Sequence, residues 1–220
     1  GRDAVFDAHV DGVRDLEQGG AFDPWEVTGR LRDHAVRFRG RTGEQNRVEY
    51  CIVVEGHSGI TLRAENPDNP LDKAFSAREI EIGDDAFDAV AYVYGPEDVL
   101  RAVLDAGTRD LLRELLGGRV RLAGLKTMGV DASVAVHDGE LIAAFNGNRI
   151  EWARHQLAGI LGTLVDVIER LEPPQDAPRR IAHNNATEPE WQVRLANLLL
   201  LEIQYPNHPA TREALKQGCA

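Results

Sequence analysis

The stretch EVTGRLRDHAVRFRGRTGEQNRVEYCIVV, residues 26–54, decides the fold class of this chain. Apolar and polar residues alternate along it, first around Val27 and then around Val36 and Phe38. A period of two is typical of β-strands that bury one face and expose the other. The polar, glycine-containing segment 42–46 separates two alternating runs and predicts a hairpin turn. The stretch therefore predicts an antiparallel meander.

Further strands are predicted outside this stretch. The dipeptide Asp138-Gly139 joins the alternating run 132–137 to the run 140–145, which is a strong hairpin signal. The remaining predicted strands share short apolar runs bounded by turn residues, at 60–64, 78–82, 89–94 and 119–123.

Helices are predicted where the apolar period changes to three and four residues. Two short helices are expected in 96–116, because Gly107 interrupts the stripe; Pro96 fits a first turn and Thr108 is a candidate cap for the second helix. A long helix is expected at 149–171, with Asn148 as its candidate cap. These helices should cover one face of the sheet. The predicted core joins apolar positions from the helices and the strands, namely Leu100, Leu104, Leu112, Leu157, Leu161, Leu164, Val36, Phe38, Ile52, Val54, Val134 and Val136.

The chain is expected to have four parts. Asp3–Gln18 shows apolar residues at steps of three and four before Gly19-Gly20, which predicts an amphipathic N-terminal helix. A proline-rich run near residue 175 indicates a linker. The predicted parts are an N-terminal helix in 1–22, an α+β sheet domain in 23–172, a linker in 173–178 and an all-helical segment in 179–220.

The helical segment contains one unusually apolar helix, predicted over 188–205. A helix that is apolar around nearly its whole circumference must be covered on two sides. The short helices predicted at 179–186 and 208–217 are too small to cover it entirely. The candidate interaction residues are Trp191, Leu195, Leu198, Leu199 and Ile203.

Two stretches resemble known kinds of domain. The run Gly83-Asp84-Asp85-Ala86-Phe87-Asp88 with the hairpin around Asp138-Gly139 resembles a group of uncharacterised bacterial α+β domains of unknown function. The stretch from Glu190-Trp191-Gln192 to Glu213-Ala214-Leu215 looks like a HEAT-type helical repeat. The resemblance implies an α+β module followed by the opening of a helical solenoid, and it implies no enzymatic activity.

Composition narrows the class of protein. The formal net charge is −11 and no apolar run reaches the roughly 18 residues that a membrane span needs. The acidic balance disfavours binding to bulk nucleic acid or anionic membranes. Only two cysteines occur, Cys51 and Cys219, so no disulfide framework is indicated and a reducing, cytoplasmic setting is expected.

A cluster of arginines on the polar side of the early strands suggests one alternative function. A basic sheet face can hold single-stranded RNA, although such platforms usually add exposed aromatic side chains. Pairing with acidic residues on neighbouring strands is the favoured interpretation. The possible basic face consists of Arg30, Arg32, Arg37, Arg39 and Arg41.

A second alternative is a metal-dependent hydrolase that uses Asp84, Asp85, Asp88 and an unassigned histidine. The aspartates lack the spacing of a known calcium loop, and none of the seven histidines forms a zinc-binding pair. A solvated turn anchored by Phe87 is favoured, so no catalytic residue, metal or cofactor is assigned.

The favoured function is therefore a non-catalytic protein-interaction or scaffold module with a helical docking segment. The expected partner is another protein or further helical repeats of the same chain, and a homo-oligomer is also open. Nucleic acid is disfavoured and no membrane is expected.

Overall fold

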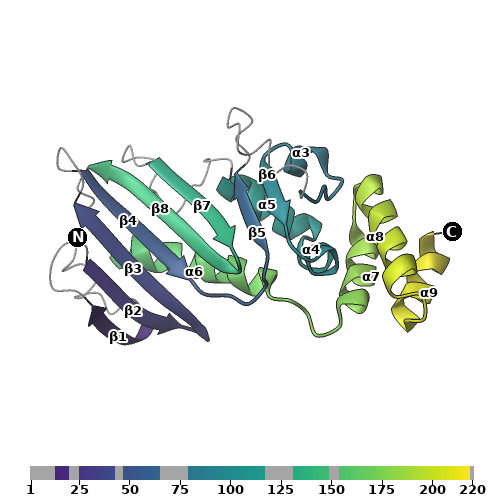
Figure 1. Ribbon diagram of the computed structural model, residues 1–220, viewed down its shortest axis with the longest axis horizontal. Coiled ribbons are helices and arrows are strands. Elements are labelled where there is room, and N and C mark those ends of the chain that lie inside the picture. Colours follow the sequence, from purple (N-terminus) through teal and green to yellow (C-terminus); the bar gives the residue numbers. More distant parts are fainter. Residues whose placement is uncertain are drawn as a thin grey trace.

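An eight-stranded antiparallel sheet forms the centre of the computed structural model (Figure 1). The structure describes residues 13–19, 25–42, 47–64, 79–116, 131–148 and 154–218. Within these ranges the strand order is β1-β2-β3-β4-β8-β7-β5-β6, so the hairpin β7–β8 is inserted between two parts of the chain that are nearer the N-terminus. The strands are β1 (Val13–Gly19), β2 (Trp25–Leu31), β3 (His34–Thr42), β4 (Arg47–Val54), β5 (Thr61–Ala64), β6 (Ala91–Tyr94), β7 (Asp131–His137) and β8 (Glu140–Asn148).

The β7–β8 hairpin turns at Asp138-Gly139, as the sequence predicts. Asp138 and Gly139 both have positive φ, 50° and 85°, as the favoured two-residue hairpin turns require. Gly139 also lies against the chain before β5, where an added Cβ would come within 3.1 Å of the backbone nitrogen of Ser58. This position needs glycine for its conformation and for the close approach.

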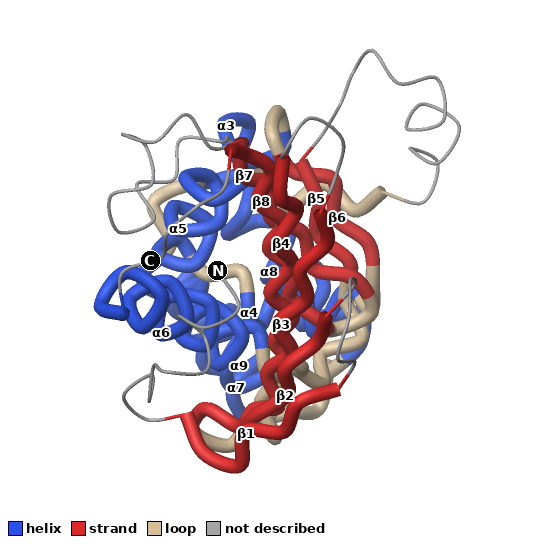
Figure 2. The backbone as a smooth tube through the Cα atoms, turned by 90° about the vertical axis from the view of Figure 1, so that its left-hand side faces the viewer, coloured by secondary structure: helices blue, strands red, loops and turns tan. Residues whose placement is uncertain are grey.

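Helices cover one face of the sheet (Figure 2), and the C-terminal helices extend beyond its β6 end (Figure 1). The helix α6 crosses the sheet near β4, and α5 packs on β7 and on α6. The other face carries no helix among the described residues. The helices are α3 (Asp85–Asp88), α4 (Glu97–Val103), α5 (Ala106–Leu116), α6 (Arg154–Leu171), α7 (Ala177–Thr187), α8 (Trp191–Gln204) and α9 (Pro209–Gly218).

The core lies between the sheet and the helices, as the two periodicities predict. Leu161 of α6 is fully buried in one continuous apolar cluster with residues of the central strands. The other predicted core positions whose side chains are described are also buried, and the side chain of Leu157 lies outside the described residues. The α+β prediction, with one helix-covered face and a helical C-terminal segment, is confirmed.

The predicted N-terminal helix is wrong over its described part. Residues 13–19 form β1, an edge strand that pairs antiparallel with β2 and shifts register between Arg14 and Glu17. A helix this short has little stability of its own, whereas pairing satisfies the outer hydrogen-bonding groups of β2. The rest of the predicted helix lies outside the described residues, as does the predicted strand 119–123.

The strand predicted at 78–82 is also wrong in the described residues 79–82, because side chains take its hydrogen bonds. The carboxylate of Asp88 accepts from the backbone nitrogens of Ile82 and Gly83. The buried guanidinium of Arg101 donates to the carbonyls of Glu81 and Ile82. Ile80 bonds to β6 through its nitrogen and the carbonyl of Val93.

Two predicted helix caps are corrected. The side chain of Asp105, rather than Thr108, caps α5, and its oxygen accepts from the nitrogen of Thr108 at 2.8 Å. Asp105 stands just before the first helical residue, where a short acidic side chain reaches the free N–H groups. Asn148 is the last residue of β8, paired with Arg47, and does not cap α6.

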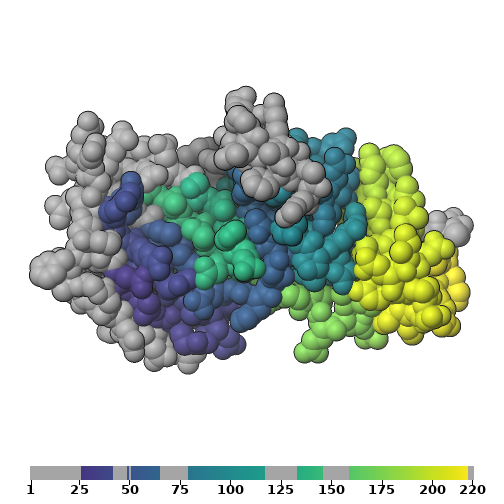
Figure 3. Space-filling model, in the orientation of Figure 1, coloured from purple at the N-terminus to yellow at the C-terminus, as the bar shows by residue number. Residues whose placement is uncertain are grey.

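The three C-terminal helices form one end of the elongated molecule (Figure 3). A non-helical segment after α6 leads to α7, whose N-cap Asp176 accepts from the nitrogen of Arg179. The helix α7 packs on α4, and both α8 and α9 pack on α7. In the described part of the chain no helix is both long and apolar enough to cross a membrane.

Candidate functional site

The outer face of α8 is an exposed apolar surface. Four large side chains spaced four residues apart remain accessible to solvent: Trp191 is 60% exposed, Leu195 49%, Leu199 47% and Ile203 76%. Residues separated by four form a continuous ridge on a helix, so these side chains make one row. We call Trp191, Leu195, Leu199 and Ile203 the α8 row. Leu198, the fifth predicted interaction residue, lies beside the row and is partly buried.

The opposite side of α8 is packed against the rest of the molecule. Leu200 and Leu201 join a cluster with Ile181 of α7 and Ala102 of α4. Val193 belongs to the main core. The described residues therefore cover one side of the helix. Because the side chains of the row are about 50–75% exposed, covering them would contribute roughly half or more of the 1.5–3 kcal/mol that full burial of a large apolar side chain supplies.

The loop before α3 approaches α8 closely. Gly83 has a φ of +94°, and an added Cβ would lie 3.2 Å from the Cβ of Gln192 and 3.3 Å from the nitrogen of Val193. Glycine permits both the conformation and the contact. The N-terminal turn of α8 is thus held against the sheet domain.

A buried ion triad fixes the start of α8. Arg109 of α5 is 1% exposed, and its guanidinium donates to both carboxylate oxygens of Glu188, at 2.7 and 2.9 Å. It also donates to Asp84, at 2.8 Å, and to the carbonyl of Leu104. Glu188 follows α7, and its carboxylate accepts from the nitrogen of Glu190. The triad Asp84–Arg109–Glu188 therefore joins α3, α5 and the α7–α8 connection.

The pKa values within the triad follow from this pairing. Burial alone would raise the pKa of Asp84, but hydrogen bonds from Arg109 and from the nitrogen of Phe87 outweigh it and hold the pKa below its ordinary value. Burial alone would lower the pKa of Arg109, and its bonds to Glu188 and Asp84 raise it instead. Asp84 and Arg109 are therefore assigned as charged at neutral pH.

Two further contacts attach the C-terminal helices to α4. The amide nitrogen of Asn184, buried in α7, donates to the carbonyls of Arg101 and Ala102 at the end of α4. The hydroxyl of Tyr205, after α8, donates to Asp98 at 2.6 Å. This bond raises the pKa of Tyr205 to about 12, with burial as the second cause. Polar contacts thus hold both ends of α8 in place.

The predicted basic face is largely neutralised by pairing. Arg37 bonds to Glu140, Arg39 pairs with Glu26 and Arg41 pairs with Glu49. These pairs lie on the open face of the sheet, in the alternating positions that the sequence indicated. Among the described residues, these pairs neutralise three of the predicted cations, which weakens the case for binding a phosphate backbone there.

The other two arginines of the predicted face make different contacts. Arg32 lies in the turn after β2 and reaches the helix layer, where it contacts Asp166 and Glu169 of α6. Arg30 donates to the carbonyl of Asp33. Arg32 is therefore separated from the open face, whereas Arg30, exposed at an alternating position of β2, stays on the face that carries Arg37, Arg39 and Arg41.

The three aspartates of the proposed metal site also diverge. The carboxylate of Asp84 is bound by Arg109, and that of Asp88 accepts two backbone N–H groups, while Asp85 is exposed. Burial raises the pKa of Asp88 against the effect of these N–H groups. Phe87 is fully buried, but the predicted solvated turn is wrong, because the segment forms the short helix α3 and Asp84 is buried at its start. No group of three metal-binding side chains occurs among the described residues.

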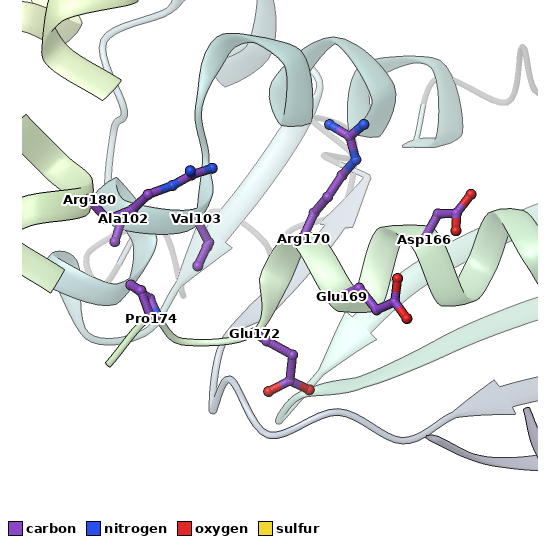
Figure 4. Close-up of a pocket in the computed structure, with 8 residues that line it drawn as sticks. All are labelled: Ala102, Val103, Asp166, Glu169, Arg170, Glu172, Pro174 and Arg180. Atoms are coloured by element: carbon purple, nitrogen blue, oxygen red, sulfur yellow. The ribbon is translucent and has the colours of Figure 1, made fainter. Parts of the chain in front are cut away.

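A cavity of about 560 Å³ lies between α4, the end of α6 and the start of α7. Its charged lining is already paired in part: Asp166 and Glu169 with Arg32, and Arg180 with Asp105. Figure 4 shows Arg170 and Glu172 pointing in opposite directions, so the charged groups do not converge on one point. The lining therefore resembles a seam between elements rather than a reaction centre.

Sequence reasoning missed Arg109 and Glu188, although one signal for Arg109 was present. Arg109 shares the buried stripe of α5 with Leu112 and Leu116, at steps of three and four. A charged residue on an apolar stripe is buried only when it is paired. Its partner Glu188 is 79 residues away along the chain, and no local pattern indicates that contact.

Comparisons of the chain with models of protein families, with curated proteins and with solved structures found no match.

Proposed function

We propose that this chain is a non-catalytic protein-interaction module and that the α8 row is its docking surface. The observation that carries the proposal is the row itself: four exposed, large apolar side chains on one helix, opposite that helix's buried side. Large apolar patches on folded proteins mark interaction sites more often than chance. Trp191 adds the residue type that most often contributes strongly to binding energy.

The surroundings of α8 support a rigid docking surface. The ion triad at its start and the Tyr205–Asp98 bond at its end hold the helix against the sheet domain. A surface that is already ordered loses little conformational entropy on binding, which favours affinity. A ridge with four-residue spacing fits the groove of another helix, so the proposed partner presents a helix with an apolar face. A helix-binding surface is consistent with the interpretation of the C-terminal helices as HEAT-like, and that interpretation is part of the proposal.

Neither alternative function has an observation in its favour. Arg37, Arg39 and Arg41 on the open face pair with glutamates. Asp84 and Asp88 accept hydrogen bonds from protein donors, and the exposed Asp85 does not join them in a cluster. An interaction module in a reducing compartment is therefore the function that we propose.

Site-specific photocrosslinking in the cells that make the protein tests this function. A photoreactive residue at Leu199 should give a discrete protein adduct, because the docked partner covers that position. The control places the same residue at Arg212, an exposed position of α9 outside the row. We expect an adduct at position 199. An excess of the wild-type chain should suppress this adduct by competition, whereas an excess of a Leu195→Asp chain should not. Equal, non-competed labelling at both positions would show that the row is not a docking surface.

A further inference from the structure

A second row of side chains runs along one flank of the α8 row. Arg194, Leu198 and Glu202 are also spaced four residues apart; the two charged residues are exposed and Leu198 is partly buried. The order along the helix is cation, leucine, anion. Glu202 makes no ion pair among the residues that the structure describes. Arg194 uses one nitrogen to reach the carbonyl of Glu188, which leaves the rest of its guanidinium available.

The two rows of one α8 are complementary to the same two rows of a second α8 that runs in the opposite direction. We propose that the partner of the α8 row is a second copy of this chain, docked with its α8 antiparallel; this proposal rests on the proposed function. A two-fold axis level with residue 197 places Trp191 opposite the partner's Ile203 and Leu195 opposite the partner's Leu199. A closed, isologous contact of this kind is the commonest symmetry of homo-oligomers.

The charges select the antiparallel arrangement. With a rise of about 1.5 Å per residue, Arg194 then lies about 3 Å along the axis from the partner's Glu202. Both residues occupy the same flank of the paired helices, because an antiparallel two-fold axis keeps each flank on its own side. In a parallel arrangement the flanks are exchanged and each Glu202 loses this partner. The dimer therefore contains two symmetry-related Arg194–Glu202 pairs and two Leu198 side chains between them.

The size of the contact sets the expected affinity. The row is about 18 Å long, since it spans twelve residues of helix. One helix face buries less than the roughly 800 Å² per partner of a standard stable interface. We expect a reversible dimer with a dissociation constant of about 10–100 µM. Because α7–α9 form one end of the molecule, the proposed contact lies at that end (Figure 1).

Sedimentation equilibrium of the purified full chain tests the proposal. Between about 1 µM and about 300 µM the weight-average mass should rise from the monomer value towards twice that value. Leu199→Asp should abolish the rise, because it places a charge in the centre of the apolar contact. Arg212→Glu on α9 is the matched control for a surface charge and should leave the dissociation constant within about twofold.

Charge reversal tests the antiparallel pairing itself. Glu202→Arg alone and Arg194→Glu alone should each weaken dimerisation about tenfold, because each replaces two attractions by two repulsions. An equimolar mixture of these two variants should recover near-wild-type association, since each chain then faces the opposite charges. Circular dichroism melts of each variant show whether it is folded before its mass is measured.

The outcomes separate this proposal from the proposed function. A wild-type chain that stays monomeric at the highest concentration overturns the second-copy proposal; a photocrosslink to a different protein at Leu199 would then still support the docking function. A dimer that Leu199→Asp leaves intact also overturns it, because the contact lies elsewhere. A dimer whose two charge variants fail to recover when mixed overturns the antiparallel arrangement.

Discussion

Arg109 shows how one residue joins two parts of this molecule. Its guanidinium is enclosed by Asp84 and Glu188. Asp84 precedes the β7–β8 hairpin in the sequence and Glu188 follows it. Removing a charge from water costs several kcal/mol, and the two carboxylates and a carbonyl offset that cost. The same pairing makes each partner dependent on the others.

Arg109→Met should therefore be strongly destabilising. The substitution leaves Asp84 and Glu188 buried without their cation, and breaking such a network costs about 3–5 kcal/mol of unfolding free energy. Urea denaturation followed by circular dichroism measures it. Arg113→Met on the same helix is the control, because the ion pair that the structure describes for Arg113 is the exposed one with Asp110, and its loss should cost at most about 1 kcal/mol. Equal effects of the two substitutions would contradict the triad.

The lowered pKa of Asp84 predicts an acid dependence of this stability. A carboxylate whose pKa is lower in the folded state stabilises the fold above its unfolded pKa, and this contribution is lost as the pH falls through the folded pKa. The difference in unfolding free energy between wild type and Asp84→Asn should shrink as the pH is lowered from 5 towards 2. A difference that stays constant over this range would show that Asp84 is not ionised in the fold.

Tyr205 predicts a change at the alkaline end. Because its folded pKa is raised from 10 to about 12, the bond to Asp98 stabilises the fold fully below pH 10 and is lost as the pH rises through 12. Titration by ultraviolet absorbance should show one tyrosine ionising late, and Tyr205→Phe should remove that component. Asp98→Asn should move it back towards pH 10. A late component that survives Tyr205→Phe belongs to another residue.

At the scale of elements, α6 illustrates what patterns in the sequence do and do not determine. Its apolar stripe identified Leu161 and Leu164 as core positions, since a helical period fixes which side chains share a face. The start of the helix could not be placed, because Asn148 is an equally good final residue of β8. Local patterns fix faces, and tertiary pairing decides boundaries.

Adjacent residues of α6 provide a matched pair of substitutions. Leu161→Ala should cost about 2–5 kcal/mol, because Leu161 is fully buried between sheet and helices. Gly162→Ala should instead stabilise by about 0.4–1 kcal/mol, since an added Cβ meets nothing within 4 Å and the unfolded chain loses freedom. Chemical denaturation of both variants tests the orientation of the helix. A stabilising Leu161→Ala or a destabilising Gly162→Ala would show that α6 is rotated.

The N-terminal strand and the segment before α3 mark the limit of such reasoning. Val13–Gly19 fits a helical period as well as a strand, and only the unpaired edge of β2 decides between them. Residues 79–82 look like a strand, yet the side chains of Asp88 and Arg101 take their hydrogen bonds. Neither competing contact is visible in the local sequence.

The residues of the α8 row could be predicted from the sequence to a greater extent than the contacts that hold α8 in place. The apolar excess of α8 identified every member of the row, because a helix so apolar must have two covered sides. Which side faces the molecule depends on Val193 and Leu201 packing against distant residues. The triad that holds α8 depends on a pairing across 79 residues, which only the fold reveals.

At the scale of the whole molecule, the chain has a sheet domain at one end and a bare helix face at the other. The inner contacts of α7–α9 with α4 and α5 make the end a rigid part of the fold, while the α8 row remains uncovered. The central claim is that a protein partner covers the α8 row in the cell.

Oxidative footprinting of side chains tests that claim most directly. Hydroxyl-radical labelling of the dilute purified chain, at about 1 µM, should modify Trp191 and Tyr94 at rates that reflect their exposed fractions of 60% and 45%. In the cells that make the protein, labelling of Trp191 should fall several-fold, while Tyr94 of β6, outside the row, keeps its rate. Equal labelling of Trp191 in cells and in dilute solution would contradict the account.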